Sequence, residues 1–366
     1  MLQKYLFTRY QEQLKKELNY NSNLNDFLSN HFLRIDDIKI NKDIYTSLDI
    51  IKPNTEINTN TNNINKVLNK TQTYLGNKYL TNKLLSPTDC IHKLNYNQTS
   101  IKIINKDKEI FNLLKTKIEE ISQLEYSLIS LFDEKYTKNN TLNNIYFTDY
   151  LDKFNNSSHI LSCYTLFNLH YPIYYIISPI ILILIPIIIK KIFPNNLFNS
   201  NSILFKVIFL GLPNLNIFEI KDFKTLVTSI LSLLFFLYNI YSSIKMSLYT
   251  KNTFNHIKTH LLNLSTLLTL SNEIYNYKDL GKQLKFSKLP DINSLFPEFN
   301  NMNIETNNIS NNLNSYGDIM VLFKKVIANK EEFIPYIKFI GFIDYLTSIN
   351  TLIYEHSYSL VTYLDN

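Results

Sequence analysis

Apolar residues recur with helical spacing over several long stretches of this chain. Residues 110–132 keep an apolar period of 3.6 residues, which predicts a long amphipathic helix with one buried side. Further stretches of the same kind run from about 254 to 268 and from 319 to about 354. A further stretch begins at Ile64 and is closed by Pro87, which predicts a helix of about six turns. The pattern predicts an all-α fold.

Two stretches in the middle of the chain carry no charged residue. Residues 171–189 and 226–244 are each 19 residues long, and at about 1.5 Å per residue each could cross a bilayer. Lysines stand at their edges, as is common beside membrane helices. The sequence therefore predicts two transmembrane helices, with two fully buried core helices as the alternative. Residues 203–218 are apolar but contain Lys206, which favours the membrane interface over a third crossing.

Composition and charge change this picture little. The 366 residues include 37 Lys and Arg against 31 Asp and Glu, a formal net charge of +6. A positive balance suits a polyanionic partner, but the lysines are scattered, so charge alone does not predict a nucleic-acid site. Charged residues make up 19% of the chain, fewer than the usual quarter, which agrees with membrane or buried helices.

The sequence contains no catalytic or metal-binding constellation. His256 and His260 have i, i+4 spacing, but no third ligand is evident, so we interpret them as a surface pair. Glu119 and Glu120 fall on the solvent side of their predicted helix. None of the five glycines belongs to a Gly-x-x-x-x-Gly-Lys-Ser/Thr loop, which cradles nucleotide phosphates. We therefore expect neither enzyme activity nor a bound metal or cofactor.

Two short stretches carry a resemblance to a known family. The first contains Thr71, Thr73, Gly76, Leu80, Leu84, Leu85 and Pro87. This spacing resembles the opening of the core domain of MutS-family proteins, and residues 45–51 resemble the Leu-Asp segment that precedes it there. Because glycine within a helix costs about 1 kcal/mol relative to alanine, Gly76 indicates a place where another helix approaches closely.

The second stretch, residues 339–349, is similar to the Leu-Asp-x-x-x-Ser-x-Ala segment of the same family. It contains Gly341, Asp344 and Ser348, and the last two share one helix face because they are four residues apart. In the family this helix leads from the second lever arm into the ATPase domain. Together the matches bracket residues 43–354 in the family's order.

The resemblance implies an all-α, MutS-like helical core with two long lever helices interrupted by a transmembrane helical hairpin. We expect an N-terminal helical extension at 1–42 and the core with the first lever at 43–170. The membrane region would cover 171–245, and the second lever with its return helices 246–366, leading to an ATPase domain absent from this chain. Two crossings would make this an integral membrane protein with both termini on one side.

The implied function is that of a membrane-anchored MutS-like core fragment. It would work with a MutS-type ATPase domain, in cis or in trans, in DNA mismatch repair or other DNA transactions. ATP and Mg are implied only for that ATPase domain. The expected partners are membrane lipid, the ATPase domain, a second copy of the chain as in the family's homodimers, and DNA. The alternative is a helical membrane scaffold that no longer binds DNA; a transporter ranks third, because neither apolar stretch contains an ionisable residue.

Overall fold

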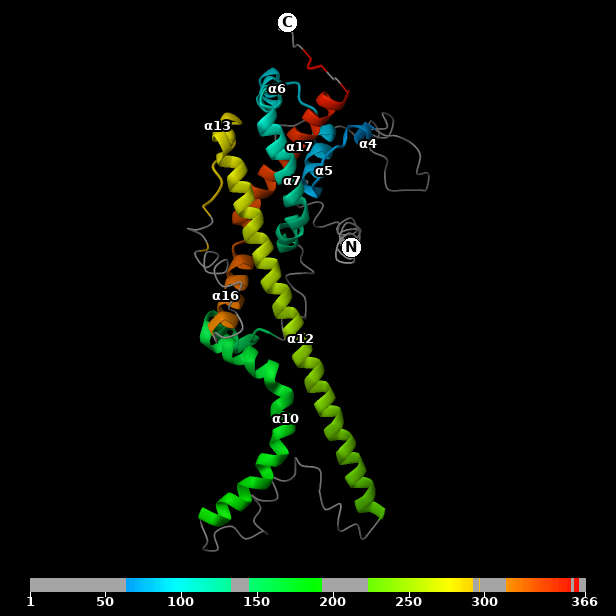
Figure 1. The fold of residues 1–366 in the computed structure, drawn as a ribbon, viewed down its shortest axis with the longest axis vertical. Helices are drawn as coiled ribbons and strands as arrows, with labels where there is room; N and C mark the ends of the chain where they lie inside the picture. The colour runs from blue at the N-terminus through cyan, green and yellow to red at the C-terminus, as the bar shows by residue number, and fades with distance from the viewer. Residues whose placement is uncertain are drawn as a thin grey trace. The chain divides into compact units, whose positions relative to one another are not determined.

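The protein is described here by a computed structural model. It describes residues 64–132, 145–192, 223–291, 296, 314–356 and 359–361. Every regular element in these ranges is a helix (Figure 1), so the prediction of an all-α fold is confirmed. The expected extension at 1–42 and the apolar stretch at 203–218 lie outside the described residues.

The elements are named by the labels of Figure 1, with η for short 3-10 turns. In chain order they are α4 (Ile64–Leu68), α5 (Tyr74–Leu85), α6 (Ile91–Lys106), α7 (Lys108–Ile129), η1 (Ser130–Phe132), η2 (Asp149–Asn156), α10 (Ser158–Ile192), α12 (Phe223–Asn276), η4 (Tyr277–Asp279), α13 (Leu280–Gln283), α16 (Asn314–Ala328), η6 (Lys330–Phe333) and α17 (Ile334–His356).

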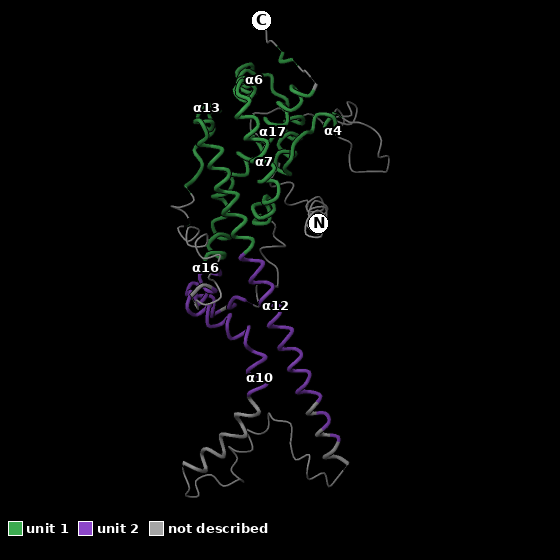
Figure 2. The backbone as a smooth tube through the Cα atoms, viewed as in Figure 1, with its two compact units in different colours: residues 1–139, 259–307, 322–366 green, residues 140–258, 308–321 purple. Residues whose placement is uncertain are grey.

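The chain divides into two compact units (Figure 2). Unit 1 consists of residues 1–139, 259–307 and 322–366, and unit 2 of residues 140–258 and 308–321. Each unit therefore combines segments that are far apart in the sequence. α12 and α16 contribute residues to both units.

Unit 1 is built around α17, which packs against α5, α6 and α7. α17 is apolar on nearly all sides, and such a helix is stable only where it is enclosed. Its largest buried apolar side chains are Tyr336, Ile337, Phe339, Ile340, Phe342, Ile343 and Leu346. Pro335 stands in the first turn of α17. Backbone N–H groups there have no partner within the helix, so the N–H that proline lacks removes no helical hydrogen bond.

α7 is the amphipathic helix that the apolar period predicts. Leu114, Ile118 and Ile121 are completely buried, whereas Glu119 and Glu120 are exposed as expected. Asp107 caps the helix by accepting hydrogen bonds from the next turn's backbone N–H groups at 2.9 and 3.2 Å, a common way to start a helix. The prediction of this helix is confirmed.

Two helices that the pattern predicts as single are divided in the structure. The expected helix from Ile64 breaks between α4 and α5, because the Oδ1 atom of Asn69 accepts hydrogen bonds from the N–H (3.0 Å) and hydroxyl (2.6 Å) of Thr71. The expected helix at 319–354 breaks at Asn329, whose side chain donates to the carbonyl of Lys325 at 2.8 Å. Asparagine and threonine compete in this way with helical backbone bonds.

α12 and α6 depart from the predicted pattern in other ways. Residues 226–244 and 254–268, expected as separate helices, lie in the single helix α12. α6 is not predicted by the apolar period, because it is polar along most of its length. Only Ser100, Ile101 and Ile104 of α6 are buried.

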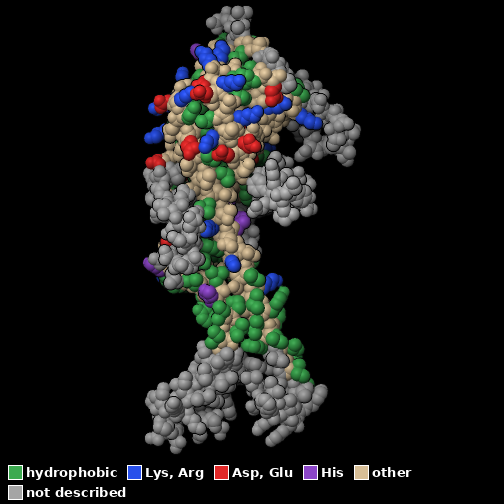
Figure 3. Space-filling model, in the orientation of Figure 1, with side chains coloured by type: hydrophobic (Ala, Val, Ile, Leu, Met, Phe, Trp, Pro, Cys, Tyr) green, Lys and Arg blue, Asp and Glu red, His purple; other side chains and the backbone are tan. Residues whose placement is uncertain are grey.

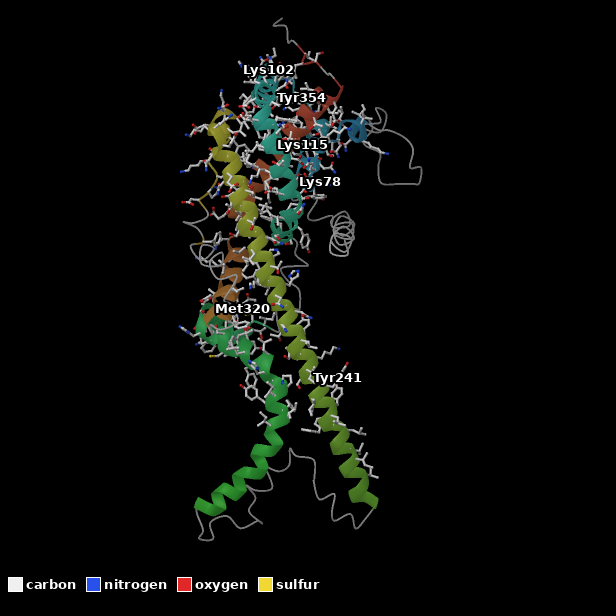
Figure 4. The ribbon with its side chains drawn as sticks, in the orientation of Figure 1. Lys78, Lys102, Lys115, Tyr241, Met320 and Tyr354 are labelled. Atoms are coloured by element: carbon white, nitrogen blue, oxygen red, sulfur yellow. The ribbon has the colours of Figure 1, made fainter. Side chains whose placement is uncertain are left out.

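Unit 2 is held together where the beginning of α16 meets the beginning of α10. A Cβ atom at Gly317 would lie 1.7 Å from the carbonyl oxygen of Ser158, so only glycine fits there. Its N–H donates to the hydroxyl of Ser162 at 2.8 Å. Three residues beyond Gly317, Met320, labelled in Figure 4, accepts a hydrogen bond at its sulfur from the hydroxyl of Thr165 at 3.2 Å.

Among the described residues, no helix is both long and apolar enough to cross a membrane. The expected transmembrane hairpin and the integral membrane location with both termini on one side are therefore wrong. α12 shows a physical reason, because its apolar residues share the helix with hydroxyl groups that pack against protein. Ser243 and Thr250 are buried, and Ser247 donates to the carbonyl oxygen of Leu169 in α10 at 2.6 Å.

Candidate functional site: a buried carboxylate junction

The two stretches that resemble the MutS family meet in unit 1. The carboxylate of Asp344 in α17 accepts hydrogen bonds from the backbone N–H of Gln72 at 3.1 Å and of Thr73 at 2.8 Å. It also accepts one from the hydroxyl of Thr73 at 2.6 Å. One turn later, the hydroxyl oxygen of Ser348 accepts a hydrogen bond from the N–H of Lys70 at 3.0 Å. Residues more than 270 positions apart in the sequence are thus joined by buried and half-buried hydrogen bonds.

A second buried carboxylate, Glu125 of α7, completes this junction. Its two oxygens each lie 2.8 Å from the backbone nitrogen of Tyr74, which donates to them. One of them also accepts from the N–H of Leu75 at 3.3 Å. Sequence reasoning missed Glu125, although a signal is present: it stands on the apolar face of α7, between Ile121 and Leu128, where an acidic residue needs a partner.

The junction satisfies the first turn of α5 completely. A helix leaves its first backbone N–H groups without partners inside the helix. Here Asp344 accepts from Thr73, and Glu125 accepts from the next two N–H groups. The N–H of Gly76 donates to the hydroxyl of Thr73 at 2.8 Å. Because a helix N-terminus carries partial positive charge, it favours the two carboxylates there.

At Gly76, α17 lies directly against α5. A Cβ atom at this position would lie 2.0 Å from Oδ2 and 2.6 Å from Cγ of Asp344. Atoms at such distances cannot coexist in a close-packed interior. The absence of a side chain at Gly76 therefore lets the carboxylate of Asp344 reach the backbone of α5.

The remaining residues of the family-like pattern lie around this junction or beyond it. Leu80 of α5 is buried, and Gly341 is buried in α17 one turn before Asp344. Thr71 bonds to Asn69 and not to α17. The residues that close the first stretch are half-buried or exposed and take no part in the junction: Leu84, Leu85 and Pro87. The structure thus brings together only part of the predicted set.

Burial controls the electrostatics of the junction. Asp344 is 1% exposed, and this burial raises its pKa to about 6, although the hydrogen bonds from Thr73 and Gln72 act in the opposite direction. Burial, and to a smaller extent the charge of Glu125, raises the pKa of the Tyr74 hydroxyl. Burial also lowers the pKa of Lys78, labelled in Figure 4, whose Nζ atom lies 5.4 Å from the ring centre of Tyr74.

The raised pKa of Asp344 predicts that this residue stabilises the fold more in acid than at neutral pH. Its ordinary pKa is 3.8 and its pKa in the folded protein is about 6, so the folded state holds the proton more tightly. This contribution is present below the ordinary pKa and is lost as the pH rises through the folded pKa, a change of about 3 kcal/mol. Other carboxylates oppose this trend, so the comparison must isolate Asp344.

Urea unfolding of the wild type and of Asp344→Asn, at pH values from about 4 to about 7, makes that comparison. We expect the free energy of unfolding of the wild type to fall relative to that of the variant across this window. Parallel pH profiles for the two proteins would contradict the raised pKa of Asp344.

Chemically, the junction is suited to holding helices together rather than to catalysis. Its polar atoms are buried, and their hydrogen bonds go to the backbone and to Thr73. Among the residues that the structure describes, no three His, Cys, Asp or Glu side chains are grouped to hold a metal ion. The interpretation of His256 and His260 as a surface pair is wrong for His260, which is buried on the apolar side of α12, with Nε2 2.7 Å from Oγ of Ser130.

The helices and the junction define a class: an all-α protein in which one buried carboxylate, Asp344, ties α5 to α17 and a second, Glu125, ties α5 to α7. Comparison of the chain with family models, with curated proteins and with solved structures finds no match. The MutS-like resemblance therefore stays a prediction that depends on the residues themselves.

Proposed function

We propose that this chain is a MutS-like helical core that works with a MutS-type ATPase domain, in cis or in trans, in DNA mismatch repair or other DNA transactions. The observation that supports the proposal is the hydrogen bonding of Asp344 to Gln72 and Thr73. Asp344 stands in one of the two stretches that resemble the family, and Gln72 and Thr73 stand in the other. We include no membrane anchor, because no described helix could cross a bilayer.

In this proposal α7 and the second half of α12 serve as the two lever helices. Both belong to unit 1, and Lys117 of α7 donates to Glu273 of α12 at 3.0 Å. This pair is largely exposed and contributes little stability. It shows that the two helices lie side by side, which is what the proposal requires of the two levers.

The end of α17 is the place where an ATPase domain would act. Tyr354, labelled in Figure 4, packs against Phe111 of α7 with ring centres 4.8 Å apart and donates to the carbonyl of Asn105 at 2.9 Å. A displacement of this end would pass along α17 to Asp344, because close-packed interiors transmit strain. The junction would then carry it to α5.

The proposal is tested by titrating the purified chain with the MutS-type ATPase domain encoded in the same genome. Isothermal calorimetry with ATP and Mg, and then with ADP, is expected to give Kd values that differ about tenfold or more. Ser348→Ala, which removes the acceptor of the Lys70 N–H, is expected to reduce this difference. Lys102→Ala, on the exposed side of α6, serves as the matched control. Equal affinities with both nucleotides, or no binding, would contradict the proposal.

An interaction scaffold without DNA contact is the second candidate. The exposed apolar side chains of α10 and α12 favour it, because an uncharged surface does not bind phosphates. Fluorescence anisotropy with labelled duplex DNA, in the presence of the ATPase domain, separates the candidates. Affinity that falls steeply with salt supports the MutS-like core, whereas absence of DNA binding supports the scaffold.

A further inference from the structure

One face of α12 is covered by exposed apolar side chains, which we call the α12 stripe. Their exposed fractions run from 36% to 67%. The stripe consists of Val227, Ile230, Leu231, Leu234, Phe235, Leu237, Tyr238, Tyr241, Ile244 and Leu248. Figure 3 shows hydrophobic side chains gathered over α10 and α12, and Figure 4 labels Tyr241 on this helix. Residues at spacings of three and four share one helix face, so the stripe is continuous.

The opposite face of α12 is already occupied. Ser243 and Thr250 are buried, and the hydroxyl of Ser247 donates to the carbonyl oxygen of Leu169 in α10 at 2.6 Å. α12 thus turns its small polar residues toward protein and leaves its large apolar residues uncovered. Single apolar side chains on a surface are ordinary, whereas a contiguous patch marks a contact surface.

The α12 stripe is large enough for a stable interface. Aromatic side chains bury about 150–250 Å² when fully covered and aliphatic ones somewhat less, so the stripe's partly exposed side chains offer roughly 100 Å² each on average. Ten such side chains provide about 1,000 Å², compared with about 800 Å² per partner in a standard interface. A second copy of the same stripe supplies a matching surface without any further element.

We propose that the α12 stripe binds the α12 stripe of a second copy of this chain in antiparallel orientation. Two-fold symmetric contacts bring residue i beside residue j and residue j beside residue i. With the axis between Leu237 and Tyr238, the stripe pairs Leu234 with Tyr241 and Leu231 with Ile244. All of these side chains are exposed, so the stripe is complementary to itself in this register.

Charge distinguishes antiparallel from parallel pairing. Residues 226–244 carry no charge, and Lys245 follows at once. Parallel pairing would place each Lys245 beside the Lys245 of the other copy, and like charges repel. Antiparallel pairing about the same axis places Lys245 beside Ile230, where the apolar stem of lysine can pack and its charged end can reach water. The inference rests on α12 alone and is independent of the proposed function.

Analytical ultracentrifugation of the full chain, over a range of concentrations in buffer free of detergent and lipid, tests self-association. We expect the wild type to dimerise and Leu234→Glu to weaken dimerisation at least about 100-fold, because each interface would bury two unpaired carboxylates. Tyr150→Glu is the matched control, since Tyr150 is 96% exposed in the same unit but outside the stripe. It is expected to dimerise like the wild type. Far-UV circular dichroism confirms that each variant remains helical.

The double variant Leu234→Glu, Tyr241→Lys tests the orientation. In the antiparallel pair, position 234 of one copy lies beside position 241 of the other, so opposite charges meet and dimerisation is restored. If the double variant stays monomeric while folded, antiparallel pairing is wrong. A wild type that is monomeric at every concentration, but floats with phosphatidylcholine vesicles in a way that Leu234→Glu abolishes, would overturn the proposal and assign the stripe to lipid.

Discussion

Replacing Gly76 by alanine is expected to lower the free energy of unfolding by about 3 kcal/mol. Within a helix this substitution ordinarily stabilises by up to about 1 kcal/mol, so both the size and the sign of the effect are diagnostic. The added Cβ would lie 2.0 Å from Oδ2 of Asp344. The carboxylate cannot simply move away, because it accepts hydrogen bonds from Gln72 and Thr73. Urea unfolding followed by circular dichroism measures the effect.

A double-mutant cycle with Asp344→Ala attributes this effect to the contact itself. Shortening Asp344 to alanine removes Oδ2 and Cγ, the two closest atoms, and leaves only its Cβ at 2.8 Å. The Gly76→Ala substitution should therefore cost markedly less in the Asp344→Ala background, since neighbouring substitutions are coupled. An additive cycle, or a single Gly76→Ala variant as stable as the wild type, would show that α5 and α17 are not in this close contact.

Replacing Asp344 by alanine is expected to destabilise the protein by about 2–4 kcal/mol at neutral pH. The change leaves the half-buried N–H of Gln72 and the buried N–H of Thr73 without their acceptor. Unsatisfied buried donors are more costly than the net gain of the bonds they lose. The free energy of unfolding in urea again provides the measurement.

Asparagine at position 344 should be much better tolerated than alanine. Oδ2 accepts all three hydrogen bonds, from the N–H of Gln72, the N–H of Thr73 and the hydroxyl of Thr73, while Oδ1 shares only the one from Gln72. One amide oxygen can occupy the place of Oδ2. Asp89→Ala is the matched control, because Asp89 is exposed and should change stability by only a few tenths of a kcal/mol. If Asp344→Ala and Asp89→Ala behave alike, the carboxylate does not hold α5 to α17.

Sequence reasoning succeeded where local spacing carries the information. The apolar period of residues 110–132 identified α7, because the same face of one helix is buried along its length. It failed for the expected helix from Ile64, where the Asn69 side chain bonds to Thr71 and interrupts the backbone pattern. It also missed α6, because few of its residues are buried. Hydrophobic period alone does not register such local competition.

The membrane expectation failed for a related reason. A run of 19 uncharged residues describes the length of an apolar segment but not what surrounds it. In the structure, α12 packs one side against α10 through Ser247 and Leu169 and exposes large apolar residues on the other. Hydropathy averages these two sides, so it cannot distinguish a lipid-facing helix from one with a separate contact face.

The sequence by itself determined the all-α fold and the amphipathic helix α7, since helical period and residue type are local properties. Its resemblance to the MutS family in two short stretches drew attention to Gly76, Asp344 and Ser348. Only the tertiary structure decided that Asp344 binds Thr73 and that Glu125 caps the same helix. It also decided which face of α12 stays uncovered. Those outcomes depend on which helix faces meet, and a buried carboxylate binds whichever N–H groups the packing of distant segments brings to it.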